Sequence, residues 1–185
     1  MTFKTKELIF IALMAALLFV LNFTIGAGII AATGIPGSSA LIDGITNLAV
    51  VTFVALVLRK FGSIALLYLV YAIIALPTHM AGGPPGFILK VPLLAGSALL
   101  FDLTIYLLKY RKSGFIIGLP ILTLFGFALY IATYYFLGMP EFQKLLTALP
   151  VIFVSFTVLG YIGMWIGFKI YNRTKHKRVV LQITA

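Results

Sequence analysis

Residues 41–60 read LIDGITNLAVVTFVALVLRK, an apolar run that ends on two adjacent basic residues. The hydrocarbon core of a bilayer is about 30 Å thick, and about 20 apolar helical residues cross it. Because Lys and Arg in short loops stay on the cytoplasmic side of a membrane, Arg59 and Lys60 predict that this helix ends inside the cell. The stretch therefore predicts a membrane helix over about 41–58 and gives its direction.

The other basic residues follow the same pattern. Twelve of the 14 Lys and Arg residues lie in an N-terminal stub, two tight loops and the C-terminal tail, and only Lys90 and Lys144 lie elsewhere. The hydrophobic stretches between the basic clusters must therefore cross the membrane in even numbers. We expect an all-α membrane protein, a six-transmembrane-helix bundle with both termini cytoplasmic. The twelve clustered residues are Lys4, Lys6, Arg59, Lys60, Lys109, Arg111, Lys112, Lys169, Arg173, Lys175, Lys177 and Arg178.

Composition indicates the same surroundings independently. The chain is 62% hydrophobic and 10% charged, with a mean hydropathy of +1.16, whereas soluble domains carry about 25% charged residues. The net charge of +10 does not indicate a nucleic-acid partner, because the basic residues are divided among four clusters at membrane edges. We expect one transmembrane domain, 1–185, in the plasma membrane and in contact with lipid. Its predicted spans are about 7–25, 41–58, 62–77, 87–108, 114–137 and 147–171.

Two irregular stretches fall on the expected outer side. The first, Gly26 to Ala40, is apolar and rich in Gly and Ser, and the second follows Pro77 and includes several Gly and Pro residues. Proline and glycine both disfavour continued helix. Irregular backbone at membrane depth requires protein or a water-filled cavity to satisfy its amides. We therefore expect these stretches to form a lid above an outward-facing concavity.

The sequence lacks the common signatures of catalysis. It has no cysteine and only two histidines, His79 and His176, so a paired-histidine zinc site on one helix is excluded. No serine lies in a Gly-x-Ser-x-Gly elbow, and no Walker loop is present. Asp43 and Asp102 are expected in opposite leaflets, too far apart for joint acid–base work. We expect a protein that is not an enzyme and has no metal or cofactor.

Both of these aspartates lie within predicted spans. A carboxylate inside a membrane helix costs around 2.5 to 3.5 kcal/mol on insertion scales, so Asp102 should face the bundle. We favour a structural link for Asp102, either toward a nearby basic loop residue or as the cap of a neighbouring helix, over ligand contact. Asp43 shares a helix face with Thr46 and Asn47. This face is either a polar strip aimed into the bundle or a helix start with Asp43 as its cap.

Further polar and aromatic residues collect on the outer side. Tyr130, Thr133 and Tyr134 share one helix face, and such a stripe suits stacking and hydrogen bonding to a small planar ligand. Tyrosines at these positions also serve as anchors in the headgroup region. Lys90 could meet a ligand anion, Glu141 or a lipid phosphate. The candidate ligand-binding residues are Asn22, Asp43, Asn47, His79, Lys90, Tyr130 and Tyr134.

The first span carries small residues four apart, Ala12 and Ala16. Small residues at this spacing let another helix approach closely, either within the bundle or from a partner. Together with the topology, this feature resembles the substrate-binding S component of energy-coupling-factor (ECF) vitamin transporters. Members of that family are similar in length, have six spans with both ends inside, and carry an Ala-xxx-Ala motif that docks onto a transmembrane coupling subunit. The resemblance covers nearly the whole chain and implies docking through Ala12 and Ala16.

Within the family, the chain is most similar to the thiamine and hydroxymethylpyrimidine branch. The similarity lies in Gly44-Ile45 through Arg59-Lys60-x-Gly62, an Ala/Ile-rich third helix, the Gly82-Gly83-Pro84-Pro85-Gly86 loop and the pair Asp102, Lys109. That branch places acids in the third helix, whereas Ala65 to Leu76 contains none. A neutral or anionic ligand is therefore nearly as well supported as cationic thiamine.

The resemblance implies a binding subunit that captures a vitamin or precursor from outside, for ATP-driven uptake by a coupling subunit and two ATPase subunits. Residues Gly34 to Ser39 and His79 to Gly86 would close the outer mouth. Two other readings remain open on sequence alone. The chain could be a solitary small-molecule carrier or channel, or a membrane assembly factor that binds no small molecule.

Overall fold

The computed structural model describes residues 2–33, 40–78, 85–138 and 142–184; the side chains of some helical residues, including Asp43 and 142–149, lie outside this description. Within these ranges the regular structure is entirely helical, which confirms the expected all-α class. The helices are α1 (Thr5–Thr33), α2 (Ala40–Leu58), α3 (Ser63–Ala75), α4 (Lys90–Leu107), α5 (Lys112–Phe136), α6 (Phe142–Thr174) and α7 (Arg178–Thr184).

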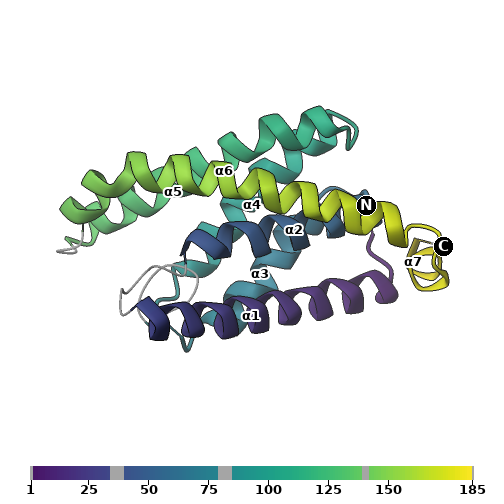
Figure 1. The fold of residues 1–185 in the computed structure, drawn as a ribbon, viewed down its shortest axis with the longest axis horizontal. Helices are drawn as coiled ribbons and strands as arrows, with labels where there is room; N and C mark the ends of the chain where they lie inside the picture. The colour runs from purple at the N-terminus through teal and green to yellow at the C-terminus, as the bar shows by residue number, and fades with distance from the viewer. Residues whose placement is uncertain (1, 34–39, 79–84, 139–141, 185) are drawn as a thin grey trace.

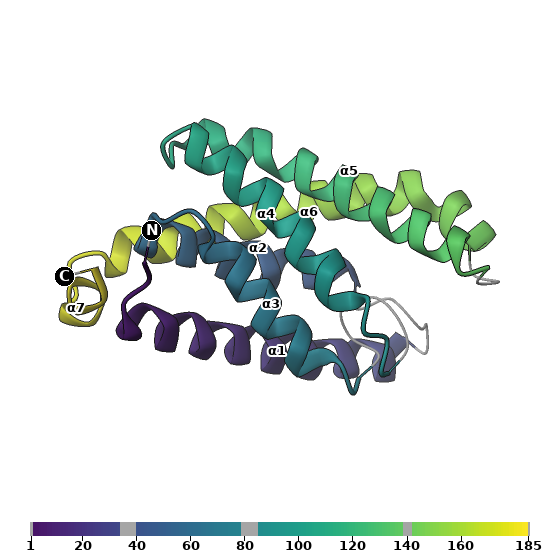
Figure 2. The same ribbon diagram turned by 180° about the vertical axis from the view of Figure 1, so that it is seen from behind.

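The six long helices pack around the bundle in a closed order. Helix α1 packs against α2 and α3, α3 against α4, α4 against α5, α5 against α6, and α6 against α2. Successive helices run in opposite directions, so both chain termini lie at one end of the bundle, here called the termini end (Figures 1 and 2). The other end, where α1, α3 and α5 finish, is called the distal end.

Within the residues that the structure describes, four helices are long and apolar enough to cross a membrane. The qualifying segments are Thr5–Gly26, Lys90–Leu107, Lys112–Phe136 and Phe153–Thr174, from α1, α4, α5 and α6. The other two long helices are apolar but shorter: the described part of α2 that qualifies as apolar is Gly44–Leu58, and α3 has 13 residues. At about 1.5 Å per residue, α3 is about 20 Å long, less than the roughly 30 Å of a hydrocarbon core.

Helix α1 differs from the sequence-based expectation at its distal end. It continues to Thr33, so the prediction that residues 26–33 belong to an irregular lid is wrong. Glycine costs about 1 kcal/mol relative to alanine in a helix, but Gly26 and Gly28 are followed by residues that tolerate or favour helix, including Ala31 and Ala32. Apolar surroundings also favour a backbone whose hydrogen bonds are all internal. Residues 34–39 and 79–84 of the predicted lid lie outside the described residues, and Ala40, its last residue before the second span, begins α2.

The closest helix packing joins α2 and α6 through two glycines of α6. A Cβ atom added to Gly163 would overlap the backbone carbonyl of Ile45, and one added to Gly167 would lie 2.6 Å from the carbonyl oxygen of Ala49. Because real Cβ atoms do not approach a backbone oxygen so closely, only glycine fits at these positions. The spacing of four residues puts both glycines on one face, so α2 lies directly against the α6 backbone.

The termini end is closed by contacts of both chain ends. Glu7, at the start of α1, is 4% exposed and forms an ion pair with Lys60 at 2.7 Å. The same carboxylate accepts a hydrogen bond from the backbone amide of Lys4 at 2.8 Å. At the other terminus, α7 packs against α1 and α2 and buries Val180. These contacts tie both termini to the first two helices.

Candidate ligand site

A cluster of buried polar side chains lies between α1, α2 and α3, toward the distal end. Asn22 of α1 is 1% exposed. Its amide nitrogen donates to the hydroxyl of Tyr71 at 3.1 Å, and its amide oxygen accepts a hydrogen bond from the hydroxyl of Thr46. Three helices thus contribute one polar group each to a single chain of hydrogen bonds.

A second pair extends this chain of polar groups toward α5. The hydroxyl of Tyr68 donates to the amide oxygen of Asn47 at 3.5 Å. The rings of Tyr68 and Tyr71 meet edge to face, with centroids 6.2 Å apart. Tyr130 of α5 interacts electrostatically with both of these tyrosines. We refer to the combined set as the polar cluster: Asn22, Thr46, Asn47, Tyr68, Tyr71 and Tyr130.

Helical periodicity explains why these residues face one another. On α1 the buried residues Ile11, Ala15, Leu18 and Asn22 are spaced three or four apart, so they form one inward stripe that ends in an amide. On α3, Ile64, Leu67, Tyr68 and Tyr71 form a similar stripe. Within these two stripes, the polar side chains Asn22, Tyr68 and Tyr71 follow the apolar ones in the direction of the distal end.

The polar cluster has side chains of the kind that bind small molecules. Its described side chains carry no formal charge and offer amide and hydroxyl donors and acceptors beside aromatic rings. Small-molecule sites commonly combine apolar and aromatic walls with a few placed polar groups. Such a set suits the hydrogen-bonding edge and flat face of a small heterocycle.

The structure gathers only part of the predicted site. Asn22, Asn47 and Tyr130 belong to the polar cluster, and Tyr134 lies one turn further along α5, where its ring packs against Phe87 with centroids 6.4 Å apart. Two predicted residues fall outside the description. The side chain of Asp43 is not described, although its backbone lies in α2 one turn before Asn47, and His79 lies outside the described residues.

The described hydrogen bonds of the two charged residues of α4 are made to backbone atoms outside the polar cluster. Lys90 is fully buried and donates to the backbone oxygen of Thr78 at 2.6 Å. Asp102 accepts a hydrogen bond from the backbone amide of Ile64 at 3.0 Å. Of the structural roles expected for Asp102, capping of a neighbouring helix is therefore the one observed. The described contact of Lys90 is structural, and its contact with a ligand remains a prediction.

Three members of the cluster were not among the predicted site residues: Thr46, Tyr68 and Tyr71. Thr46 had been placed on the polar face of the second span, but only as a neighbour of Asp43 and Asn47. Tyr68 and Tyr71 lie three residues apart in an otherwise apolar stretch. This is the same spacing signal that singled out Tyr130 and Tyr134, and it would have identified them had it been applied to the third span.

The small residues of α1 point away from the bundle core. Ala12 is exposed and Ala16 is half-buried, whereas Ala15 between them is fully buried. The large side chains beside Ala12 are also exposed, with Ile9 at 55% and Leu13 at 64%. We call this surface of Ile9, Ala12, Leu13 and Ala16 the α1 outer face. It is an apolar surface with a shallow centre, because alanine leaves room there.

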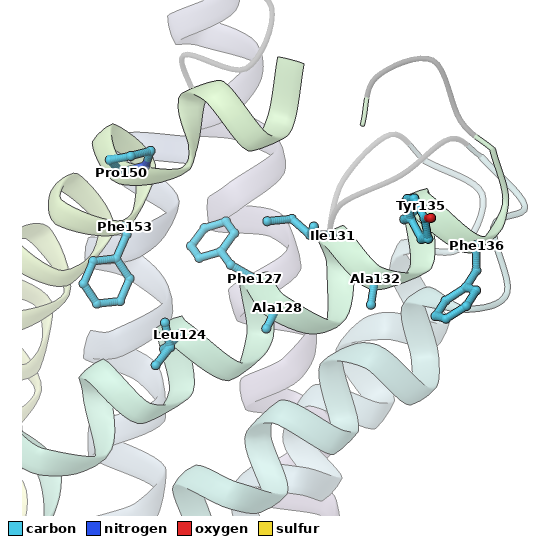
Figure 3. A pocket seen from close by; sticks show the side chains of 9 residues that line it. All are labelled: Leu124, Phe127, Ala128, Ile131, Ala132, Tyr135, Phe136, Pro150 and Phe153. Carbon is cyan, nitrogen blue, oxygen red and sulfur yellow. The ribbon is translucent and has the colours of Figure 1, made fainter. Parts of the chain in front are cut away.

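Two apolar grooves lie on the outside of the bundle, and neither includes a residue of the polar cluster. The larger, about 630 Å³, lies between α5 and α6 and is walled by Phe127 and Phe153, with Ala128 and Ala132 on its floor and Tyr135 and Phe136 at one end (Figure 3). The smaller, about 460 Å³, lies beside α3 and α4 and includes Phe3 and Gly96. Neither groove offers the hydrogen-bonding groups that a vitamin would need.

Comparisons of the chain with protein-family models, curated proteins and solved structures find no match. The geometry of the polar cluster and of the α1 outer face therefore carries the functional conclusion.

Proposed function

We propose that this protein is the substrate-binding subunit of an ECF-type importer. It captures a small vitamin or precursor from outside the cell, with thiamine and hydroxymethylpyrimidine as the favoured candidates. The observation that carries this proposal is the polar cluster, where side chains of α1, α2, α3 and α5 converge inside a strongly apolar bundle. Polar residues within membrane helices are costly to bury and commonly mark a site of function.

The proposed topology has six crossings, with the termini end in the cytoplasm of a cell whose plasma membrane holds the protein. Basic residues cluster at the termini end, which is the side that short positively charged loops favour. There the ammonium of Lys169 lies 4.8 Å from the ring centroid of Trp165, and tryptophan is enriched at membrane–water interfaces. In this orientation the polar cluster lies nearer the outer surface, where a scarce nutrient arrives.

The α1 outer face supports a second part of the proposal, a docking site for the coupling subunit. Apolar side chains surround small residues on a helix that no other part of the described bundle covers at this face. Helices associate in a bilayer mainly by close van der Waals packing, for which small residues are suited. The coupling subunit and two ATPase subunits would then supply the energy for release of the vitamin inside.

Binding to the isolated protein tests the proposed site. We expect purified protein in mild detergent to bind hydroxymethylpyrimidine or thiamine by isothermal titration calorimetry. Tyr71→Phe should raise the Kd about tenfold, because it removes one hydroxyl from the site and leaves the amide nitrogen of Asn22 without its acceptor. Thr104→Val is a matched control, since that hydroxyl bonds only the carbonyl of Leu100 within its own helix and lies outside the polar cluster. No binding of either compound by the wild type, or equal effects of the two variants, would reject the site.

The position of Asp43 separates the two candidate ligands. Its backbone lies on α2, one turn before Thr46 and Asn47. Asp43 is therefore the acid that shares a helix face with these two members of the polar cluster. A thiamine cation would need a counter-charge, whereas hydroxymethylpyrimidine would not. We therefore expect Asp43→Asn to weaken thiamine binding about tenfold and hydroxymethylpyrimidine binding less than twofold. Equal losses for both compounds would exclude the role of Asp43 as the counter-charge.

A further inference from the structure

Helix α3 begins without a cap of its own. It supplies Tyr68 and Tyr71 to the polar cluster but has only 13 residues. The residue before its first turn is Gly62, at φ 90°, and no side chain caps the helix from that position. The first backbone amides of any helix lack partners within the helix and need an acceptor from elsewhere.

That acceptor is Asp102 of the neighbouring helix α4. The carboxylate is fully buried and accepts a hydrogen bond from the amide of Ile64 at 3.0 Å. A negative charge at this end is favourable, because the amino end of a helix carries a partial positive charge.

The other end of α3 meets the second charge of α4. Lys90 is also fully buried, and its ammonium donates to the carbonyl oxygen of Thr78 at 2.6 Å, in the turn that ends α3. A positive charge at the carboxyl end of a helix is favourable for the converse reason. Both charged residues of α4 thus lie at an end of α3, each with the sign that its end favours.

The spacing of the two charges matches the length of α3. Lys90 and Asp102 are 12 residues apart on α4, which corresponds to about 18 Å of helix rise. The 13 residues of α3 cover nearly the same length, and the two helices pack against each other in opposite directions (Figure 2). A shift of α3 along α4 by one turn would therefore separate both charges from their partners.

We propose that Lys90 and Asp102 are positioning residues that fix α3 along α4, and thereby hold Tyr68 and Tyr71 in register with Asn47 and Asn22. The inference rests on the proposed function, because the polar cluster is the site that it positions. Neither charged residue contacts the ligand in this role. Each acts through the ends of α3, and the ligand is bound by the cluster.

A double-mutant cycle tests this role with hydroxymethylpyrimidine and thiamine as probes. We expect Asp102→Asn to raise the Kd about tenfold, and less than twofold in a background that carries both Tyr68→Phe and Tyr71→Phe. The loss in the second background is small because Asp102 acts on binding through the hydroxyls of these two tyrosines. A general loss of stability would instead add equally in both backgrounds. Thr104→Val is the matched control, since its hydroxyl bonds only the carbonyl of Leu100 within α4, and it should change the Kd less than twofold.

Hydrogen exchange of the protein without ligand provides a second measurement. Asp102→Asn should speed exchange of the first amides of α3 at least tenfold, and Lys90→Met should do the same for the turn at residues 76–78. Lys90→Met also serves as the second variant for the binding cycle if Asp102→Asn does not fold. Exchange that stays at wild-type rates, or a binding loss of equal size in both backgrounds, would overturn the positioning role. Wild-type protein that binds neither probe would reject the proposed function, while the exchange rates would still decide whether the two charges fix α3.

Discussion

Two pairs of small residues with the same spacing have opposite surroundings in this bundle. Gly163 and Gly167 of α6 lie against the α2 backbone, whereas Ala12 and Ala16 of α1 belong to an outer face. Small residues four apart indicate that a helix is able to approach closely, but not which helix does so. The filled pair holds the bundle together, whereas the described part of the bundle leaves the pair at the surface uncovered, and we propose that this pair receives a helix from another subunit.

The largest loss of stability should come from a larger side chain in the contact between α2 and α6. A Cβ at Gly163 overlaps the carbonyl of Ile45, so Gly163→Ala should lower the free energy of unfolding by about 3 kcal/mol, at the upper end of typical overpacking costs. Gly96→Ala on α4 is the matched control, because nothing lies within 4 Å of the added atom. That change should raise stability by about 0.5 to 1 kcal/mol through helix propensity alone. Chemical denaturation in detergent micelles measures both, and similar values for the two variants would contradict the close α2–α6 contact.

We expect an intermediate loss of stability when Ala15, which lies between Ala12 and Ala16 in sequence, is replaced by a larger residue. Ala15 is fully buried, so Ala15→Leu should cost about 1 to 3 kcal/mol by overpacking the contact of α1 with α2 and α3. The same measurement on Ala12→Leu should give a change within about 0.5 kcal/mol, as is usual for surface positions. If Ala12→Leu proved the more destabilising of the two, the assignment of inner and outer faces on α1 would be reversed.

The smallest effect on stability should accompany a complete loss of transport. Ala12→Leu and Ala16→Leu fill the shallow centre of the α1 outer face, so we expect them to abolish uptake of labelled vitamin in cells that also make the coupling and ATPase subunits. Binding to the isolated subunit should remain within twofold of wild type, because the polar cluster lies on the opposite face of α1. Uptake that persists without the ATPase subunits would favour a solitary carrier, and a fall in binding would reject the docking role.

Much of the helical framework could be predicted from the sequence. Apolar runs that end on pairs such as Arg59-Lys60 mark helix ends, because basic residues are excluded from apolar surroundings. The exception, the continuation of α1 to Thr33, shows the limit of reading Gly26 and Gly28 as helix breakers. Each glycine makes the helix about 1 kcal/mol less favourable than an alanine would, and the surroundings of the helix outweigh this cost.

The candidate site was less predictable, because its members meet across helices. Asn22 and Asn47 were recognisable as amides within apolar spans, but their partners Tyr71 and Tyr68 read as apolar members of the third span. The role of Lys90 depends on the end of α3 being beside the start of α4, which no local pattern encodes. The four-residue spacing of Gly163 and Gly167 is a local signal of a close helix contact, but it does not tell which helix lies against them.

The ion pair between Glu7 and Lys60 has a practical consequence for work with this protein. Lys60 also bonds the backbone oxygen of Thr2 at 3.4 Å, so the first residues are held against the turn from which α3 starts. An affinity tag or fluorescent fusion placed directly before Thr2 would pull on that turn and, through Gly62, on the amide of Ile64 that Asp102 holds. Labels attached by a flexible linker, or inserted elsewhere, would leave this junction undisturbed.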